Sequence, residues 1–421
     1  MNIYSYIASL KSRGSKLGLD RISAALAELG DPQDSLPVIH VSGTNGKGSF
    51  SYMTASVLTS AGYKTGAFTS PYLADVRECY LIDSEIISES DFDLFGNEIL
   101  EVCEKHLLTE YEFITVLAFW YFYRKKADVA VVECCMGGTL DATNVMKKPL
   151  LSVITGVALD HMNYLGGSVG KIAAHKAGII KEGCPVLAGK CPPSAMKVIS
   201  ERAEKLGSPL TKTDYRKVGI KDISLDGMTL THPELGKISL SLSAAYQKYN
   251  AANVIEACGI LAENGLRIAP DDIKRAFSDI KIPARFEIIS KDPVVIYDGS
   301  HNPDGAEAFE SSYRALFGEQ KFVLVMGVMA DKDHRKMMEM IKPSVSRACT
   351  VKPDNARSLD PVMSAREFKE LGIPCESFDD FESGLKSALD TAKAENSPLV
   401  VLGSLYMYKE FKCFINNLLL N

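Results

Sequence analysis

The run Val38-Ile39-His40-Val41-Ser42-Gly43-Thr44-Asn45-Gly46-Lys47-Gly48-Ser49 is a strand pattern followed by a glycine-rich loop, and a helical pattern follows over residues 52–61. This order presents backbone N–H groups and a helix N-terminus to phosphate, with the lysine reaching the terminal phosphates. It therefore predicts an ATP-binding loop. The general P-loop pattern fails at two positions, since Val41 replaces a glycine and Gly48 replaces Ser or Thr. A glycine-rich turn that only joins strand to helix is the alternative reading.

Short β-branched runs alternate with helical patterns along most of the chain. This alternation predicts an α/β fold with a largely parallel sheet in the N-terminal domain. A second series of runs predicts a smaller, Rossmann-like α/β domain at the C-terminus. The strands are expected at residues 38–41, 66–69, 128–134, 151–155 and 185–188, and then at 294–297, 322–326, 348–351 and 399–402.

The division between the domains is expected where a helix over 271–280 is followed by Lys281-Ile282-Pro283-Ala284-Arg285, because proline limits helix continuation. We expect an ATP-binding domain over 1–282, a hinge over 283–293 and a C-terminal domain over 294–421. Turn-rich, alternating residues near 211–242 predict a small β element appended to the first domain.

The composition excludes several classes of protein. With 421 residues, 46% hydrophobic and 24% charged, the chain resembles an ordinary multidomain globular protein. A formal charge of −6 argues against nucleic acid as a partner. The longest apolar stretch, 113–123, is far shorter than the roughly 20 residues that span a bilayer. Ten cysteines without a C-x-x-C pair, and an N-terminus unlike a secretory signal, predict reduced thiols in a cytoplasm.

Residues Gly43 to Ser49 resemble, residue for residue, the loop of the folate branch of the Mur ligase superfamily, and further motifs of that branch follow in order. They are Thr69-Ser70-Pro71-Tyr72-Leu73, the segment from Glu133 to Asn144, Leu159-Asp160-His161, Lys176-Ala177-Gly178-Ile179, Tyr246-Gln247 with Asn250-Ala251, Pro283-Ala284-Arg285 and Asp298-Gly299-Ser300-His301-Asn302-Pro303. The resemblance implies an ATP-dependent carboxylate–amine ligase that adds L-glutamate to a folate, or to dihydropteroate, through an acyl phosphate.

The resemblance also implies the nucleotide contacts. They comprise the loop Gly43, Thr44, Asn45, Gly46, Lys47, Gly48 and Ser49, the adenine-side residues Gln247 and Asn250, and Arg285, Asp298 and His301 from the second domain. On their own, the two amides would be surface residues and Asp298–His301 a loop with a satisfied histidine. The family pattern implies that the ATP site is complete when the two domains close, which excludes water from the acyl phosphate.

Glu133 ends an apolar strand, where α/β sheets place their ligand sites, and a carboxylate there can reach a magnesium ion on ATP phosphates. By itself such a glutamate could equally be solvated or a cap. The resemblance implies that Ser70, Glu133 and His161 are metal ligands and that two magnesium ions take part. Without it, His161 would be assigned to helix capping or to the core, because magnesium favours oxygen ligands.

Lys47, Lys176 and His301 are the expected catalytic residues. Helical spacing alone would make Lys176 a surface or snorkelling lysine. The resemblance implies instead that Lys176 is carbamylated by carbon dioxide, which converts a cation into an anion that helps to organise the second magnesium. That reaction needs a neutral amine and hence burial of the lysine.

Several positions depart from the commonest family pattern. Tyr72 replaces a histidine, Cys79 and Thr139 replace arginines, and Ala284 replaces a glycine. The first three lie where the resemblance places the acceptor, with Tyr72, Arg77 and Asp141 as expected substrate contacts. Thr and Cys cannot mimic arginine's planar fork, so the acceptor is less defined than the nucleotide. The Thr139 position favours polyglutamylation of folates over a bifunctional enzyme that also uses dihydropteroate.

Three other functions would each explain part of the sequence. A Mur-type ligase acting on a UDP-linked precursor usually carries an extra uridine-binding domain before the loop, whereas 42 residues precede Gly43. A P-loop kinase or ATPase explains Lys47 but not the second domain. A non-catalytic homologue would not need Lys47, Glu133, His161 and Lys176 together. We expect a monomer whose partners are small molecules, with neither nucleic acid nor membrane among them.

Overall fold

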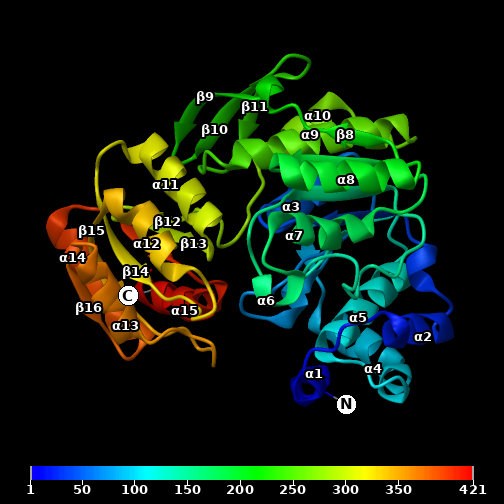
Figure 1. Ribbon diagram of the computed structural model, residues 1–421, viewed down its shortest axis with the longest axis horizontal. Helices are drawn as coiled ribbons and strands as arrows, with labels where there is room; N and C mark the ends of the chain where they lie inside the picture. Colours follow the sequence, from blue (N-terminus) through cyan, green and yellow to red (C-terminus); the bar gives the residue numbers. More distant parts are fainter. Residues whose placement is uncertain (1, 420–421) are drawn as a thin grey trace. The chain divides into compact units, whose positions relative to one another are not determined.

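The structure is a computed structural model that describes residues 2–419. The chain divides into two compact units, residues 1–216 with 249–277 and residues 217–248 with 278–421. Each unit is an α/β structure (Figure 1), as the alternating patterns predict. No helix among residues 2–419 is long and apolar enough to cross a membrane.

The first unit is built on a sheet of eight strands within the described chain, in the order β4-β3-β2-β5-β1-β6-β7-β8. Six strands run parallel, namely β2, β5, β1, β6, β7 and β8, while β3 and β4 form an antiparallel edge beside β2. Their bounds are β1 Val38–Ser42, β2 Thr65–Phe68, β3 Tyr80–Ile82, β4 Glu85–Ile86, β5 Val129–Glu133, β6 Leu151–Gly156, β7 Val186–Lys190 and β8 Leu210–Lys212. Strands β1, β5 and β6 are neighbours, so the loops that follow them meet at one edge of the sheet.

The helices of this unit begin with α1 Ile3–Leu10, α2 Asp20–Glu28, α3 Lys47–Ser60, α4 Glu89–Lys105 and α5 Glu110–Arg124. They continue with α6 Met162–Leu165, α7 Val169–Lys176, α8 Pro193–Lys205, α9 Gln247–Glu263 and α10 Pro270–Ser278. Helix α3 begins at Lys47, five residues before the predicted helix, because the glycine loop turns directly into it.

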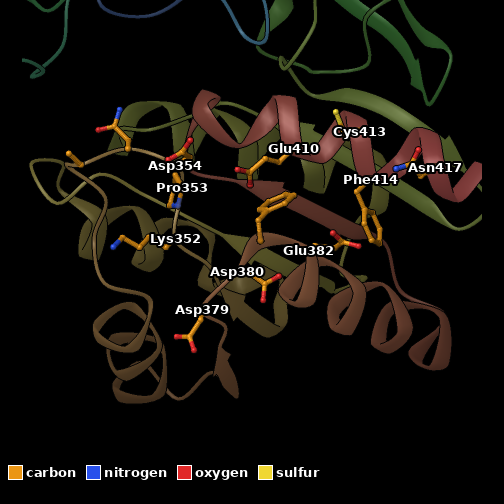
Figure 2. Close-up of a pocket in the computed structure, with 13 residues that line it drawn as sticks. Lys352, Pro353, Asp354, Asp379, Asp380, Glu382, Glu410, Cys413, Phe414 and Asn417 are labelled. Carbon is orange, nitrogen blue, oxygen red and sulfur yellow. The ribbon is translucent and has the colours of Figure 1, made fainter. Parts of the chain in front are cut away.

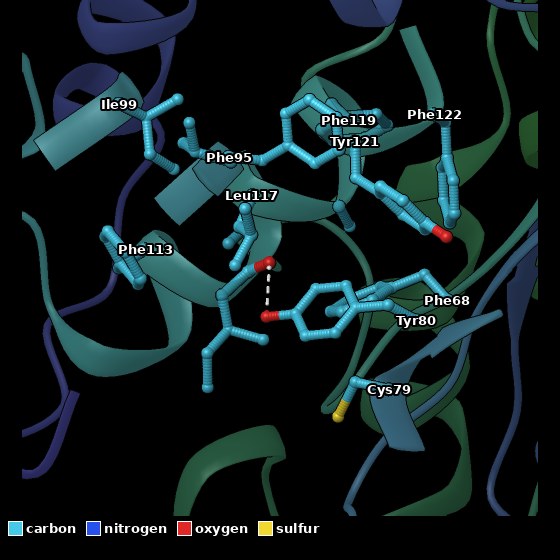
Figure 3. Close-up of a cluster of buried hydrophobic side chains, with 14 of the residues drawn as sticks. Phe68, Cys79, Tyr80, Phe95, Ile99, Phe113, Leu117, Phe119, Tyr121 and Phe122 are labelled. Atoms are coloured by element: carbon cyan, nitrogen blue, oxygen red, sulfur yellow. Dashed lines mark hydrogen bonds between the residues drawn. The ribbon is translucent and has the colours of Figure 1, made fainter. Parts of the chain in front are cut away.

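An aromatic core fixes one face of the first sheet (Figure 3). Tyr80 from β3 is fully buried among side chains of α4 and α5, and its hydroxyl donates a hydrogen bond of 3.2 Å to the carbonyl of Ile114. Burying one such aromatic side chain contributes about 2–3 kcal/mol. The core therefore holds the sheet edge from which the motif loops start.

The second unit carries a sheet of six strands among the described residues, in the order β12-β13-β17-β14-β15-β16. Its strands are β12 Glu287–Lys291, β13 Val294–Asp298, β14 Phe322–Met326, β15 Val345–Thr350, β16 Cys375–Ser377 and β17 Leu399–Leu402. Its helices are α11 Pro303–Phe317, α12 His334–Ile341, α13 Pro361–Glu370, α14 Phe381–Glu395 and α15 Tyr408–Leu419.

Two expectations about the division of the chain differ from the structure. The segment 283–293 is not a bare hinge, because β12 lies inside it and pairs antiparallel with β13. The small β element, a separate sheet of β9 Gly219–Ser224, β10 Gly227–His232 and β11 Gly236–Leu240, belongs to the second unit rather than the first. The reason is packing: Ser241 Oγ donates to the carbonyl of Ile280, and Ala244 joins the core of the second unit.

Candidate active site

The glycine loop between β1 and α3 is held by close packing. Gly46 caps α3 in the left-handed region with φ +84°, and a Cβ there would lie 2.5 Å from Oδ1 of Asn250. A Cβ at Gly43 would lie 2.0 Å from Oγ1 of Thr155. Both positions therefore require glycine, which explains their spacing in the loop.

The end of β6 anchors the same loop by hydrogen bonds. The amide of Thr44 donates to the carbonyl of Gly156 at 2.9 Å, and Oγ1 of Thr155 donates to the carbonyl of Asn45 at 2.8 Å. No motif in the sequence marks Thr155, because its role arises only from β6 lying beside β1. These contacts preform the loop and aim the N-terminus of α3, which attracts anions.

Lys47 and Glu133 meet beside this loop. Glu133 ends β5 in register with Val41, and its side chain is only 4% exposed. Lys47 Nζ lies 3.9 Å from its Oε1, and the amide of Ser70 donates to its Oε2 at 3.4 Å. The predicted phosphate-binding lysine and the predicted metal ligand Glu133 are thus brought together with Ser70.

The residues predicted to hold magnesium fit that ion in part. Oγ of Ser70 is buried and has no hydrogen-bond partner among the described atoms, so an oxygen beside Glu133 is left for a cation. His161 lies at the same sheet edge, beyond β6, with its side chain 39% exposed and its Nε2 3.9 Å from Oδ2 of Asp160. Within residues 2–419 there is no group of three His, Cys, Asp or Glu side chains placed to hold a metal. The ligand set stays a prediction.

Lys176 lies under the glycine loop. It is the last residue of α7 and is only 3% exposed. Its Nζ donates a hydrogen bond of 2.6 Å to the carbonyl of Gly43. Burial, and then the nearby positive charge of Lys47, lower the pKa of Lys176 to about 7. A neutral amine is therefore present near physiological pH, as carbamylation requires.

Two residues predicted on the adenine side lie in the first turn of α9. Gln247 begins that helix and is fully buried, and Asn250 is 8% exposed, with its amide oxygen against Gly46. Asn250 therefore packs directly against the glycine loop.

The predicted residues of the second unit form a local cluster of their own. Asp298 ends β13 and is fully buried. Its oxygens accept hydrogen bonds from the Tyr246 hydroxyl at 2.9 Å and from the amides of Phe286 and Ser300 at 2.8 Å. Nδ1 of His301 lies 3.0 Å from the carbonyl of Gly299. Asp298 thus fixes two segments of backbone by hydrogen bonds. One is at Phe286, directly after Arg285, and the other is at Ser300, after the end of β13.

Comparison with known proteins decides the family. Residues 41–260, more than half of the chain, match the Mur ligase middle domain, and residues 284–405 match the Mur ligase glutamate ligase domain. The chain belongs to the Mur ligase family. It is therefore an ATP-dependent ligase, which removes the simple kinase or ATPase and the non-catalytic homologue as readings.

Relatives place it in the folate branch of this family. It is 35% identical over 402 residues to "Folylpolyglutamate synthase" of Lacticaseibacillus casei, covering 92% of each chain. It is 31% identical to "Dihydrofolate synthase/folylpolyglutamate synthase" of Bacillus subtilis (strain 168), covering 97% of each. Mycobacterium tuberculosis folylpolyglutamate synthase, solved with ADP and AMPPCP, superposes with a TM-score of 0.90 at 27% identity and 98% coverage of both chains.

The Mur-type loop after β5, residues 134–144, packs tightly on the end of α7. A Cβ at Gly138 would lie 2.7 Å from the carbonyl of His175, and a Cβ at Gly178 would lie 2.0 Å from Oγ1 of Thr139. The motif with Gly137-Gly138 and the motif Lys176-Ala177-Gly178 therefore pack directly against each other. Thr139 uses its hydroxyl within this contact, donating to the carbonyl of His175 at 3.0 Å.

The Asp141 side chain is turned into this loop. It is 6% exposed, and its oxygens accept hydrogen bonds from the amides of Met136 at 2.9 Å and Thr143 at 3.0 Å. Burial raises the pKa of its carboxyl above the usual value, while these hydrogen bonds oppose the rise. Asp141 therefore has a structural role as the internal acceptor of this short loop, and its substrate contact stays a prediction.

The other predicted acceptor contacts lie beyond β2. Tyr72 is half-buried against the aromatic core, and the Arg77 guanidinium is paired with Asp75 at 2.8 Å. Cys79, where the family commonly has arginine, is 2% exposed within that core (Figure 3). Cys79 is therefore a packing residue. The cysteine in place of the family's arginine leaves this apolar core without a buried positive charge.

A small pocket of about 490 Å³ opens beside the loop after β5. Its lining residues are Thr139, Leu140, Tyr164, Leu165, Gly166, Lys171, Ala174 and His175. Tyr164 is 62% exposed and Leu140 42%. No single motif marks this pocket, because its walls come from two separate parts of the chain, residues 139–140 and residues 164–175.

A cavity of about 940 Å³ lies in the second unit between the loop after β15, the start of α14 and α15 (Figure 2). Asp354, Asp379, Asp380, Glu382 and Glu410 line it. This concentration of carboxylates would repel the phosphates of a nucleotide. This lining argues against the cavity as the ATP site.

Proposed function

We propose that this chain uses ATP to add L-glutamate to a folate. The acceptor carboxylate attacks the γ-phosphorus, and ADP leaves. The amino group of glutamate then attacks the carbon of the acyl phosphate, inorganic phosphate leaves, and the amine loses a proton. The matched glutamate ligase domain, and relatives named for folate ligation, support this proposal.

The observation that carries the proposal is the meeting of Lys47, Glu133 and Lys176 around Gly43. The N-terminus of α3 and the ammonium of Lys47 offer positive charge to the ATP phosphates. The bound nucleotides of the Mycobacterium tuberculosis structure support ATP as the nucleotide here.

Magnesium is the metal we propose, with Ser70, Glu133 and His161 as its protein ligands and a second ion near Lys176. When bound, it would offset the charge that develops on the transferring phosphoryl group. In this chain, Glu133 supplies the buried negative charge, and the otherwise unpartnered Ser70 hydroxyl supplies a neutral oxygen.

Carbamylation of Lys176 is part of the proposal. The amine nitrogen forms a bond to the carbon of carbon dioxide and releases a proton, which leaves an anionic carbamate. The lowered pKa of Lys176 supports this step, because the neutral amine is the reactive form.

For the acceptor we propose a reduced folate over dihydropteroate. Thr139 supports this choice, because it stands where the resemblance to the family links the absence of an arginine to polyglutamylation of folates. A bifunctional enzyme is the second candidate, and the name of the Bacillus subtilis relative favours it.

The proposal also covers the nucleotide contacts of the second unit, the oligomeric state and the compartment. Arg285 and His301 contact the nucleotide, the protein is a monomer, and it works in the cytoplasm. Ten free cysteines support a reducing compartment. Size-exclusion chromatography with light scattering tests the oligomeric state.

The test of the function is a balance of products. Purified protein is incubated with ATP, magnesium and glutamate, with tetrahydrofolate or dihydropteroate added in parallel, and ADP and amide are quantified by mass spectrometry. We expect one ADP per amide and a higher kcat/KM with tetrahydrofolate. An equal or higher kcat/KM with dihydropteroate would favour the bifunctional enzyme, and ADP without amide would refute ligation.

A further inference from the structure

A buried histidine on β1 touches the loop after β5 at a point that the proposed chemistry does not use. Side chains alternate along a strand, so His40 and Ser42 project from the same face of β1. Ser42 Oγ donates to the carbonyl of Gly137 at 2.5 Å, and His40 Nε2 lies 2.8 Å from Oγ1 of Thr143. Two polar side chains of β1 therefore hold this loop at both ends.

The direction of the hydrogen bonds follows from the partners. Thr143 Oγ1 donates to Oδ1 of Asp141 at 2.7 Å, so its lone pair is left to accept from Nε2–H of His40, and the same Nε2 lies 3.1 Å from Sγ of Cys134, which begins the loop. Nδ1 of His40 is then a bare acceptor, which agrees with its having no partner among the described atoms. Burial lowers the pKa of His40 to about 3, so the ring is neutral.

The chain of bonds continues into the site. Asp141, which accepts from Thr143, also accepts from the amide of Met136, near the start of the loop. The loop begins directly after Glu133, and its middle is bonded to the end of α7 beside Lys176 through Thr139. A displacement of Thr143 would therefore be transmitted to the surroundings of both Glu133 and Lys176.

We propose that His40 is a positioning residue of the ligase, which donates from Nε2 to Thr143 and so fixes the loop 134–144 beside the glycine loop. The activity part of this inference rests on the proposed function. His40 does not touch a substrate; it acts through Thr143 and Asp141.

The kinetic test removes each partner of the hydrogen bond between His40 and Thr143 by a substitution that keeps the side chain's approximate shape. His40→Phe and Thr143→Val should each lower kcat/KM for the acceptor on the order of tenfold, while the Kd for ADP stays within about twofold because the glycine loop has its own anchors. The double variant should lose no more than the worse single variant. His40→Gln, which keeps a donor near the Nε2 position, should restore most of the loss.

Thr54→Val is the matched control. Thr54 is as fully buried as Thr143, but its hydroxyl has no hydrogen-bond partner among the described atoms. Its replacement should leave kcat/KM unchanged. If Thr54→Val lowered activity as much as Thr143→Val, the effect would be general packing and the proposal would be overturned.

Hydrogen exchange of the loop gives a readout that is independent of ligation. His40→Phe and Thr143→Val should speed exchange in peptides that cover Met136 and Thr143 on the order of tenfold, with peptides of α3 unchanged. Unchanged exchange and unchanged kcat/KM in a folded variant, or losses that multiply in the double variant, would overturn the proposal. If His40→Phe fails to fold, Thr143→Val decides. If the wild type makes no amide, the proposed function fails while the exchange arm still tests the positioning role.

Discussion

Replacement of Lys176 with methionine should change how the stability of the first unit depends on pH. In the folded protein the pKa of Lys176 is lowered from 10.5 to about 7 by burial. The unfolded chain therefore binds one more proton than the folded chain between these two values, and the free energy of unfolding of the wild type rises with pH through this window. Methionine carries no proton, so the variant lacks this rise.

The magnitude follows from the two pKa values. Each pKa unit corresponds to about 1.4 kcal/mol, and the wild type should gain about 2 kcal/mol relative to Lys176→Met between about pH 7 and about pH 9. The lost hydrogen bond to the carbonyl of Gly43 lowers the stability of the variant at every pH and cancels in this comparison.

Urea unfolding at several pH values measures the difference. The fluorescence of Trp120, the single tryptophan, reports on α5 of the same unit. Buffers are freed of carbon dioxide so that Lys176 stays an amine. Lys197→Met is the control, because the Lys197 side chain is 76% exposed and should show no such pH dependence. A stability difference between wild type and Lys176→Met that stays constant from about pH 7 to about pH 9 would refute the buried, neutral lysine.

Other variants test the remaining parts of the site. Lys47→Ala should lower kcat on the order of 100-fold or more with the fold retained, because a charge that stabilises the transferring phosphoryl group is lost; near-normal turnover would remove the ATP-site assignment. Glu133→Gln should raise the magnesium concentration for half-maximal rate on the order of tenfold, and unchanged magnesium dependence would show that Glu133 is not a ligand. Gly46→Ala should weaken ADP binding on the order of tenfold, because the left-handed conformation costs about 1–2 kcal/mol and the new Cβ meets Asn250. Gly62→Ala, also at positive φ but with open space around it, should bind ADP normally; equal losses in both would exclude the clash as the cause. Lys176→Ala should lose activity and regain part of it with a small added carboxylate, and full activity without rescue would argue against a carbamate.

The sequence contained enough to predict most strands and the loops that meet at their ends. The β-branched runs of β1, β5 and β6 are local signals, and the glycine loop follows directly from its motif. The assignment of β9 to β11 to the second unit was not predictable, because it depends on packing against Ile280 and the core around Ala244. Likewise β12 is defined by its pairing with β13, while the prolines around it resemble a hinge.

The candidate site was predictable in its residue types and less so in their orientation. Lys47, Glu133 and Ser70 are brought together as the motifs imply. The inward turn of Asp141 and the burial of Cys79 depend on how one loop and one core pack, which no spacing in the chain records.

Transfer of oxygen from the acceptor to phosphate tests the central claim most directly. A folate labelled with ¹⁸O in its glutamate carboxylates is incubated with the protein, ATP, magnesium and L-glutamate, and the inorganic phosphate and the amide are analysed by mass spectrometry. Ligation through an acyl phosphate predicts one ¹⁸O atom in the phosphate for each amide formed. Phosphate without ¹⁸O, or ADP formed without amide, would contradict it.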